Sequence, residues 1–300
     1  MRGSDVRGVM AIGRAAKAAV VLGLGLVGCT PDFEKISEVK DLRILAVRAD
    51  PQEQLVLPGS TAFGPVRIDA LVVDPRAPAE LVDWELSGCT AEDQNCDEAT
   101  YKVRLASGRG RLDAIRAELP FHEQLAQQAL KKDPFRGFGG VPVLVELRVK
   151  KGSEEVWAIK RVVYGYTQPL DKAPNRNPSL ARVKADDREP VAGWTVKPEA
   201  EVKLLPEPAP DAKEKYRVLT FSGGSRTLDE FLTYSFFATR GALKDNTTGG
   251  KPSPFVTNRK VDEVFTTWKA PKELGLVTLW VVVRDDRGGV GWWSATVEVK

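Results

Sequence analysis

The sequence predicts a mainly β protein made of two antiparallel β-sandwich domains, the first of which carries a short helical insertion. Short runs rich in Val, Ile and aromatic residues recur along the chain, and segments containing glycine or proline separate them. One stretch, residues 120–132, instead has apolar side chains at helical spacing. The roughly 270 residues after position 28 suffice for two domains of about 120–130 residues each.

The first predicted domain spans residues 41–167 and opens with a strand at Leu42–Ala49 whose two faces are both largely apolar. Pro51 and Pro58 interrupt the chain after it, as is typical of the turns between short strands. Because the runs are short and their connections are rich in turn residues, we expect an antiparallel sandwich. The further strand-like runs are Val66–Val73, Leu81–Leu86, Tyr101–Ala106, Val141–Lys150 and Val156–Tyr166.

A helix and an aromatic loop interrupt this β pattern. Within Pro120–Lys132, apolar residues that include Phe121 and Leu125 fall on one face of a helix, so we expect a helical insertion there. The next segment, residues 135–140, reads Phe-Arg-Gly-Phe-Gly-Gly and predicts a flexible loop.

Residues 168–178 predict a stiff linker, because the segment holds three prolines and almost no apolar periodicity. The second predicted domain follows at 179–300. No long helical period appears in this half, so we expect a second antiparallel sandwich. Its expected strands are Ser179–Lys184, Glu201–Leu205, Tyr216–Phe221, Leu232–Ala238, Val277–Arg284 and Trp292–Val299.

The first 28 residues have the composition of a secretory signal peptide. Four basic residues and one acid precede or border an apolar run at Ala18–Leu26, and small residues lead up to Cys29. The apolar run has about half the roughly 20 residues that span a bilayer, so we expect no transmembrane helix.

Leu26-Val27-Gly28-Cys29 resembles a lipobox, the cleavage motif of bacterial lipoproteins. The resemblance implies that Cys29 carries a diacylglycerol anchor and becomes the mature N-terminus. Residues 29–40 are then a tether to the membrane, and Thr30 in place of an aspartate favours the outer membrane over the inner one. Which face of that membrane the protein occupies is left open. The alternative is an ordinary secretory signal in which Cys29 has no role.

Charge and one glycine motif bear on two classes of ligand. Without residues 1–28 the chain holds 40 basic and 40 acidic residues, so no charge excess favours binding to nucleic acid. Residues 23–28 match the GxGxxG dinucleotide pattern, which needs a helix directly after the glycines. Pro31 follows instead, so we expect no nucleotide ligand.

Cys89 and Cys96 are the only cysteines besides Cys29, and six residues separate them. In an oxidising compartment such a pair predicts a disulfide that closes a short loop. A free, redox-active pair is the alternative. The spacing does not fit a zinc site, which needs further ligands.

The second predicted domain resembles immunoglobulin-like or PKD-like extracellular domains in three segments, Leu232–Gly241, Thr267–Pro271 and Leu279–Gly289. The last of these ends in a turn that reads Asp-Asp-Arg-Gly-Gly. We expect Asp285 or Asp286 to hydrogen-bond the turn backbone, and Gly288 and Gly289 to adopt positive φ. Together with the lipobox, the chain as a whole resembles bacterial envelope lipoproteins with tandem immunoglobulin-like domains.

The sequence offers no catalytic constellation. His122 is its only histidine, and no nucleophile motif accompanies it. The acidic pairs Asp285-Asp286 and Asp186-Asp187 suit turn capping, and neither lies in an EF-hand loop; calcium binding at the first pair stays open. We therefore expect a non-enzymatic protein with no metal site and no cofactor beyond the acyl anchor.

Four aromatic residues are candidate contacts for a partner. Trp292 and Trp293 are consecutive on a predicted strand, so their side chains point to opposite faces and one of them should face outward. Exposed tryptophans are common anchors in interfaces with proteins or glycans. Phe135 and Phe138 on the glycine-rich loop form a second candidate contact site. The alternative for each is packing beneath a loop or against the linker.

These observations lead to three functional hypotheses. The first is a lipid-anchored cell-envelope protein that acts as a non-enzymatic binding, adhesion or accessory module for another envelope protein. The second is a carbohydrate-binding surface lipoprotein, because tryptophans gather in the second half. The third is an envelope hydrolase whose carboxylates come together only in the folded chain.

Overall fold

The computed structural model describes residues 35–91, 95–167, 171–252 and 264–300. Residues Lys35–Lys300 pack together as one unit. Within the described residues the chain is mainly β, with one α-helix and one short 3-10 helix, which confirms the predicted class at this level. Over the same ranges, none of the helices has the length and apolar character needed to cross a membrane.

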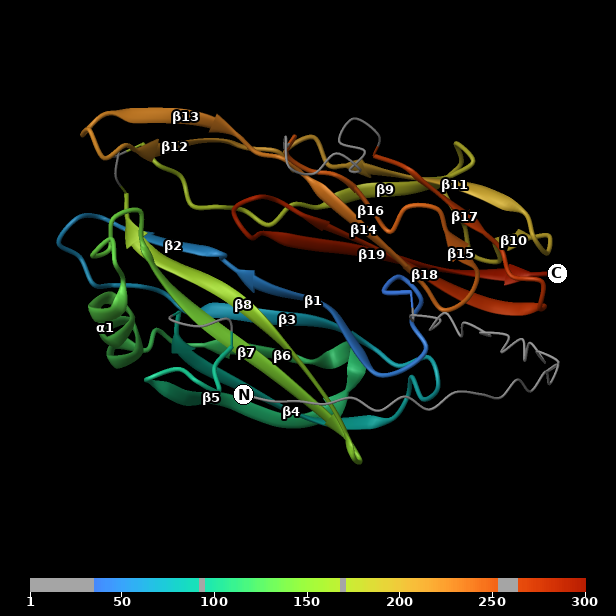
Figure 1. Ribbon diagram of the computed structural model, residues 1–300, viewed down its shortest axis with the longest axis horizontal. Helices are drawn as coiled ribbons and strands as arrows, with labels where there is room; N and C mark the ends of the chain where they lie inside the picture. The colour runs from blue at the N-terminus through green and yellow to red at the C-terminus, as the bar shows by residue number, and fades with distance from the viewer. Residues whose placement is uncertain (1–34, 92–94, 168–170, 253–263) are drawn as a thin grey trace, which may run out of the picture. The chain divides into compact units, whose positions relative to one another are not determined.

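The elements before position 167 form two sheets (Figure 1). They are β1 (Arg43–Asp50), β2 (Glu53–Val56), β3 (Val66–Val73), β4 (Leu81–Thr90), β5 (Lys102–Arg111), η1 (Leu112–Ala114), β6 (Arg116–Leu119), α1 (Glu123–Lys132), β7 (Val141–Lys151) and β8 (Glu154–Tyr166). One sheet has the order β1-β3-β6 and the other the order β2-β8-β7-β4-β5. The paired strands are antiparallel except β2 and β8, which run parallel.

These two sheets enclose an apolar core, as a β-sandwich requires. Val66 and Ile68 of β3 are buried in one cluster with Leu147 and Val149 of β7. On β3, Arg67 between the two buried residues is exposed, because side chains alternate between the faces of a strand.

The predicted helical insertion is present as α1, which begins three residues later than expected. His122 is its N-cap, and the Nδ1 atom of that imidazole accepts a hydrogen bond from the Leu125 N–H at 3.1 Å. Leu125 and Ala129 are buried in a small cluster with Val143 of β7, so the apolar face of the helix packs on the sheet.

The second half forms two further sheets and a separate hairpin. The elements are β9 (Leu180–Ala185), β10 (Thr195–Val196), β11 (Glu201–Pro208), β12 (Lys215–Leu219), β13 (Ser225–Asp229), β14 (Thr233–Ala238), β15 (Ala242–Leu243), β16 (Thr247–Gly249), β17 (Thr266–Lys269), β18 (Gly275–Arg284) and β19 (Val290–Val299). One sheet has the order β10-β19-β18-β14-β16 and the other β15-β17-β11-β9, while β12 and β13 pair only with each other.

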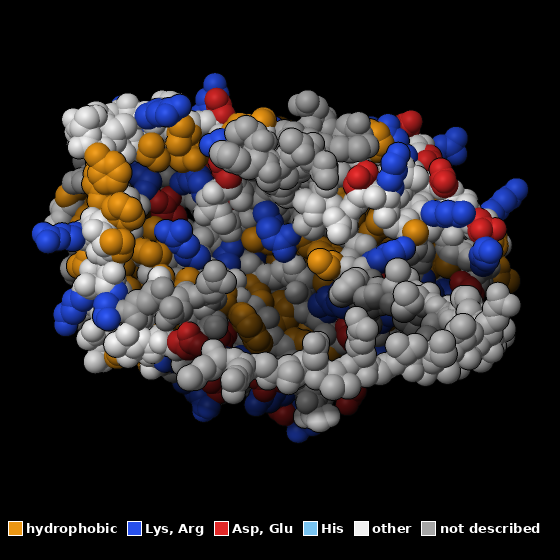
Figure 2. Space-filling view, viewed as in Figure 1, with side chains coloured by type: hydrophobic (Ala, Val, Ile, Leu, Met, Phe, Trp, Pro, Cys, Tyr) orange, Lys and Arg blue, Asp and Glu red, His pale blue; other side chains and the backbone are white. Residues whose placement is uncertain are grey.

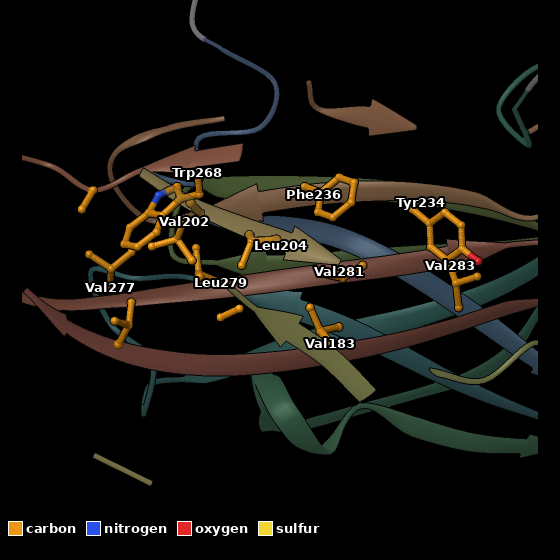
Figure 3. Close-up of a cluster of buried hydrophobic side chains, with 14 of the residues drawn as sticks. Val183, Val202, Leu204, Tyr234, Phe236, Trp268, Val277, Leu279, Val281 and Val283 are labelled. Atoms are coloured by element: carbon orange, nitrogen blue, oxygen red, sulfur yellow. The ribbon is translucent and has the colours of Figure 1, made fainter. Parts of the chain in front are cut away.

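Figure 3 shows the core between these two sheets, in which Trp268, Phe236 and Leu279 are almost completely buried. The indole N–H of Trp268 donates a hydrogen bond to the Arg240 carbonyl at 3.0 Å. A buried tryptophan needs such a partner, because an unpaired polar N–H in an apolar core is costly.

A third apolar cluster, which we call the seam, joins the two pairs of sheets. It brings Leu45 of β1 together with Trp280 and Val282 of β18. The second half of β18, residues 279–283, is therefore buried on both faces, because the intervening residues, such as Val281, point into the core between the two sheets of the second half. Burial on both faces explains why these five residues are all apolar, without alternation.

The described part of the predicted linker, residues 171–178, packs along the seam. Asn175 is 2% exposed. The Asn177 side chain donates to the Ala49 carbonyl at 2.8 Å and accepts from the Val290 N–H at 2.9 Å. The segment thus connects both halves by hydrogen bonds. The domain boundaries at 41–167 and 179–300 stay a prediction.

The turn between β18 and β19 adopts part of the expected geometry. Asp285 Oδ1 accepts from the Arg287 and Gly289 N–H groups at 2.9 and 2.7 Å, as the Asp-Asp-Arg-Gly-Gly sequence predicted. Gly288 has a φ of 101°, but Gly289 does not adopt positive φ, so that expectation was wrong. Gly289 is required for a different reason, since a Cβ there would overlap the Asp285 carboxylate.

Candidate interaction surfaces

Cys89 and Cys96 form the predicted disulfide, with Cα atoms 5.5 Å apart. Both are fully buried, beside Leu144. The backbone N–H of Cys96 donates to the Glu146 carboxylate at 3.3 Å, so the disulfide loop is fixed on β7 as well as on β4. Cys29, the predicted lipidation site, lies outside the described residues.

Glu146 beneath this loop is an example of a buried acid with several partners. Arg148 donates to it at 2.6 Å and Lys102 at 3.2 Å. Burial alone would raise the pKa of Glu146, but these hydrogen bonds outweigh it and hold the pKa below its usual range. The disulfide and its surroundings are therefore a satisfied structural unit.

Phe135 and Phe138, the two predicted loop contacts, lie at the surface together with a third residue, Phe221. The three side chains are 58%, 38% and 80% exposed. The Phe138 and Phe221 rings stack with centroids 4.9 Å apart, and Phe135 lies 5.9 Å from Phe221. We call these three residues the phenylalanine cluster. Figure 2 shows hydrophobic side chains gathered at the left end of this face, where Figure 1 places the start of β7 and the β12–β13 turn.

Local hydrogen bonds shape the loop that carries Phe135 and Phe138. The Asp133 carboxylate, just after α1, accepts from the Gly137 N–H at 2.5 Å and from the Phe135 N–H at 3.3 Å. Gly137 and Arg136 both have positive φ, at 82° and 53°. This backbone turns the two aromatic side chains toward the β12–β13 hairpin.

Phe221 was missed by the sequence analysis, which placed it at the end of a strand over Tyr216–Phe221. In the structure β12 ends at Leu219, and Phe221 occupies the turn, where the Thr220 N–H donates to the Gly224 carbonyl at 2.9 Å. The signal that could have indicated this is the sequence Ser222-Gly223-Gly224, because such residues favour turns. That Phe221 lies beside Phe135 and Phe138 of the first half follows only from the tertiary structure.

Trp292 and Trp293 are both half-buried and point to different clusters. Trp293 packs against the core between the two sheets of the second half. Trp292 packs in the seam, and the Arg48 guanidinium lies 4.7 Å from its ring centroid. Trp292 also lines a groove of about 880 Å³ along the seam. The groove has Trp280 and Leu71 among its apolar residues and Arg76, Arg111, Arg240, Lys40, Asp74 and Asp113 among its charged ones.

The remaining candidates from the sequence have local structural roles. The Asp286 carboxylate accepts from the Phe231 N–H at 3.3 Å, and Asp186 accepts from the Lys203 N–H at 2.9 Å. Asp187, like Asp186, has positive φ. Across the described ranges, no group of three or more His, Cys, Asp and Glu side chains is arranged to hold a metal ion.

A buried ionic network lies beside the β18–β19 turn. Its members, which we call the Arg287 network, are Glu53, Lys172, Glu214, Glu230 and Arg287. The Arg287 guanidinium donates to Glu53 at 2.7 Å and to Glu230 at 3.2 Å, and it covers the ring of Tyr216 at 4.5 Å. Lys172 pairs with the second Glu53 oxygen at 2.5 Å.

Glu230 is the most deeply buried acid of the Arg287 network, with no exposed side-chain surface. Burial raises the pKa of Glu230 to about 7, an effect that exceeds the opposing influence of the Glu214 backbone N–H and of Arg287. The network ties β2, the 171–178 segment, the β12–β13 hairpin and the β18–β19 turn together.

Comparisons with known proteins show no close relative. No family model matches the chain, and no curated protein matches it. A nucleoside hydrolase-related hypothetical protein from Saccharophagus degradans is 12% identical over 43% of this chain and 26% of its own, with a TM-score of 0.26. Alpha-2-macroglobulin from Escherichia coli is 10% identical over 89% and 22%, with a TM-score of 0.25.

A third solved structure, beta-glucuronidase 3 from Bacteroides uniformis, is 12% identical over 85% of this chain and 24% of its own, with a TM-score of 0.24. The chain spans about a quarter of the length of these three solved chains. Likeness at this level carries no argument about function.

Proposed function

We propose that the chain is a lipid-anchored cell-envelope protein that acts as a non-enzymatic binding module built on two immunoglobulin-like β-sandwiches. The lipobox-like segment that ends at Cys29 supports the anchor, and the outer membrane is its proposed location. The observation that carries the binding role is the phenylalanine cluster. It gathers three exposed aromatic side chains from two distant parts of the chain.

Large aromatic side chains supply much of the binding energy in protein interfaces, where they are buried at the centre of the contact. In the free protein, the 80% exposed ring of Phe221 leaves apolar surface in water, which is unfavourable. A partner that covers the phenylalanine cluster would remove this surface from water. We assign the partner as another envelope protein, since the three rings do not form one flat platform for a sugar: the ring of Phe135 is tilted by 38° against that of Phe221.

Site-specific photo-crosslinking in cells tests this assignment. A photoreactive phenylalanine analogue placed at position 221 should give one discrete, light-dependent adduct whose partner mass spectrometry identifies. The matched control is the same analogue at Val191, which is 74% exposed and lies in the segment before β10. If positions 135, 138 and 221 all yield no more adduct than position 191, the phenylalanine cluster is not a binding surface.

The anchor has its own test. Replacing Cys29 by alanine should abolish metabolic labelling with a fatty acid and should move the protein from the detergent phase to the aqueous phase. Continued labelling of Cys29→Ala would exclude lipidation at this residue. A change at Cys89 is not a suitable control, since it would break the disulfide, so Thr30→Ala serves instead.

Carbohydrate binding is the second candidate function, and the groove along the seam is the observation that favours it. Trp280 and Trp292 supply aromatic surface there, and charged residues at the rim supply hydrogen-bond donors and acceptors. Sugar-binding sites combine these two features. Retention of the wild type on a glycan array, together with its loss in Trp292→Ala, would favour this function over the first.

A further inference from the structure

A second cavity, of about 470 Å³, also lies beside the β18–β19 turn. It is bordered by β1, by β8 and by the turn itself. Its charged lining residues are Lys160, Arg161, Arg284, Arg287 and Asp286. Four cations and one acid therefore line it. Arg287 is already paired with Glu53 and Glu230, so three cations remain against Asp286.

Lys160 on β8 is the most deeply buried of these cations, at 5% exposure. Its Nζ donates to the Gly288 carbonyl. In the described part of the chain no carboxylate oxygen lies within 4.0 Å of this Nζ. Asp285 acts on Lys160 from farther away, and its oxygens already accept from two turn N–H groups and the Asn175 amide.

Arg284 on β18 has a similar environment. Its guanidinium donates to the Ser235 hydroxyl at 3.2 Å and to the Leu45 carbonyl at 2.8 Å, and no carboxylate from the described ranges pairs with it. Burial lowers the pKa of Arg284. Burial also lowers the pKa of Lys160 to about 8, although the charge of Asp285 opposes this shift; the charge of Arg284 adds to it. Two cations thus lie at this cavity without a directly paired carboxylate, and the more distant Asp285 offsets the charge of Lys160 only in part.

Gln52 adds an unused acceptor to the cavity lining. The residue is 1% exposed, and its Nε2 donates to the Arg161 carbonyl at 2.6 Å, which fixes the direction of the amide. Its Oε1 accepts no hydrogen bond from any residue that the structure describes. A buried amide oxygen normally has a partner, and a small shift of this side chain toward the cavity would let a donor from outside the protein supply one.

We propose that this cavity binds a small hydroxylated carboxylate, of the size of a sugar acid. The carboxylate group lies between Lys160 and Arg284 and neutralises both, and a ligand hydroxyl donates to Gln52 Oε1. A water molecule would satisfy Gln52 but would bring no negative charge to Lys160 or Arg284. The volume lies within the range of small-molecule sites. This inference is independent of the phenylalanine cluster and of the anchor.

Calorimetric titration of the purified full chain with D-glucuronate tests the proposal. D-glucose is the control ligand without a charge, and acetate is the control ligand without hydroxyl groups. D-glucuronate should bind, D-glucose should not, and acetate should bind more weakly. Lys160→Met should weaken D-glucuronate binding by about ten- to a hundred-fold, the loss expected for a hydrogen bond to a charged group. Lys131→Met, a change at an exposed position of α1, should leave it unchanged.

Two further variants keep the result interpretable. Lys160→Gln can still donate to Gly288, so it should fold and lose D-glucuronate as Lys160→Met does. Gln52→Met should weaken the binding of D-glucuronate and leave the binding of acetate unchanged. The proposal is overturned if millimolar D-glucuronate gives no binding to the wild type, if both Lys160 variants bind it normally, or if inorganic phosphate binds and D-glucuronate does not.

Discussion

Two buried polar clusters flank the same turn, and they differ in how their charges are balanced. In the Arg287 network, one guanidinium contacts the carboxylates of Glu53 and Glu230, and Lys172 completes the pairing. In the neighbouring cavity, Lys160 and Arg284 have only neutral oxygens as partners among the described residues. The two clusters are adjacent: Gln52 lines the cavity, and the next residue, Glu53, belongs to the Arg287 network.

The contrast separates structural charges from charges available to a ligand. A buried ion pair that is complete within the protein needs nothing further, whereas a buried cation without a carboxylate raises the free energy of the empty protein. The first cluster therefore serves to hold the two halves together. The second remains unfavourable until an anion enters, and this difference can be tested by removing one charge from each.

The largest effect is expected from Arg287→Met. The change leaves Glu230 buried without its cationic partner and removes one of the two cations that pair with Glu53, so the free energy of unfolding should fall by about 3–5 kcal/mol. Urea unfolding at pH 7 measures it. Arg188→Met, at an exposed position, is the matched control and should change stability by less than about 0.5 kcal/mol. Equal effects in the two variants would contradict a structural role for the network.

Lys160→Met should change the stability in the opposite direction. It removes a buried charge that has no carboxylate partner, so without ligand the free energy of unfolding should rise by about 1–3 kcal/mol at pH 7. The pKa of Lys160 is lowered to about 8 in the folded chain, below the value of an unfolded lysine. The unfolded state therefore binds more protons above pH 8, and the wild type gains stability as the pH rises to about 10.4.

The difference in the free energy of unfolding between the wild type and Lys160→Met should consequently become smaller between pH 8 and pH 10. Urea unfolding at pH 7, 8.5 and 10 follows it. A gap that stays constant over this window would show that Lys160 is not a desolvated cation. A loss of stability in Lys160→Met at pH 7 would show that the Gly288 hydrogen bond outweighs the cost of burial.

Glu230 gives a third, smaller effect within the Arg287 network. Because burial raises its pKa to about 7, the folded chain binds more protons than the unfolded chain between about pH 4.5 and pH 7. The contribution of Glu230 is therefore fully present below pH 4.5 and is lost as the pH rises through 7. Compared with Glu230→Gln, the wild type should lose stability over this window, and parallel pH profiles would refute the raised pKa.

The smallest change in stability is expected for Phe221→Ser. Its ring is 80% exposed, so the free energy of unfolding should change by less than about 0.5 kcal/mol, while the photo-crosslinks from position 138 should disappear. Thermal unfolding and crosslinking of the same variant measure both. A large loss of stability would place the phenylalanine cluster among the structural contacts instead.

Much of the secondary structure follows from the sequence, because strands buried on at least one face leave a strong apolar pattern. Val66–Val73 was predicted with the bounds it has in the structure, and the helix was placed within three residues of its start. The edge strand β2 and the short β15 and β16 were missed, since they are short and their pairing depends on distant partners.

The candidate sites were less accessible to sequence reasoning. Phe135 and Phe138 stood out because glycines surround them, but Phe221 is brought to them only by the tertiary fold. Lys160 looks like an ordinary polar residue of an alternating strand. That it is buried without a carboxylate follows from the packing of the two halves, which no local pattern encodes.

The short pairing at residues 37–39 has a mechanical consequence. Val39 donates to the Ala238 carbonyl at 2.8 Å, and the Ala238 N–H donates to the Ser37 carbonyl at 2.9 Å. A pulling force applied to Lys35 therefore reaches β14 of the second half before it reaches β1 of the first. The load would be shared between both halves at their contact, and peeling of β1 would first require the rupture of these two bonds.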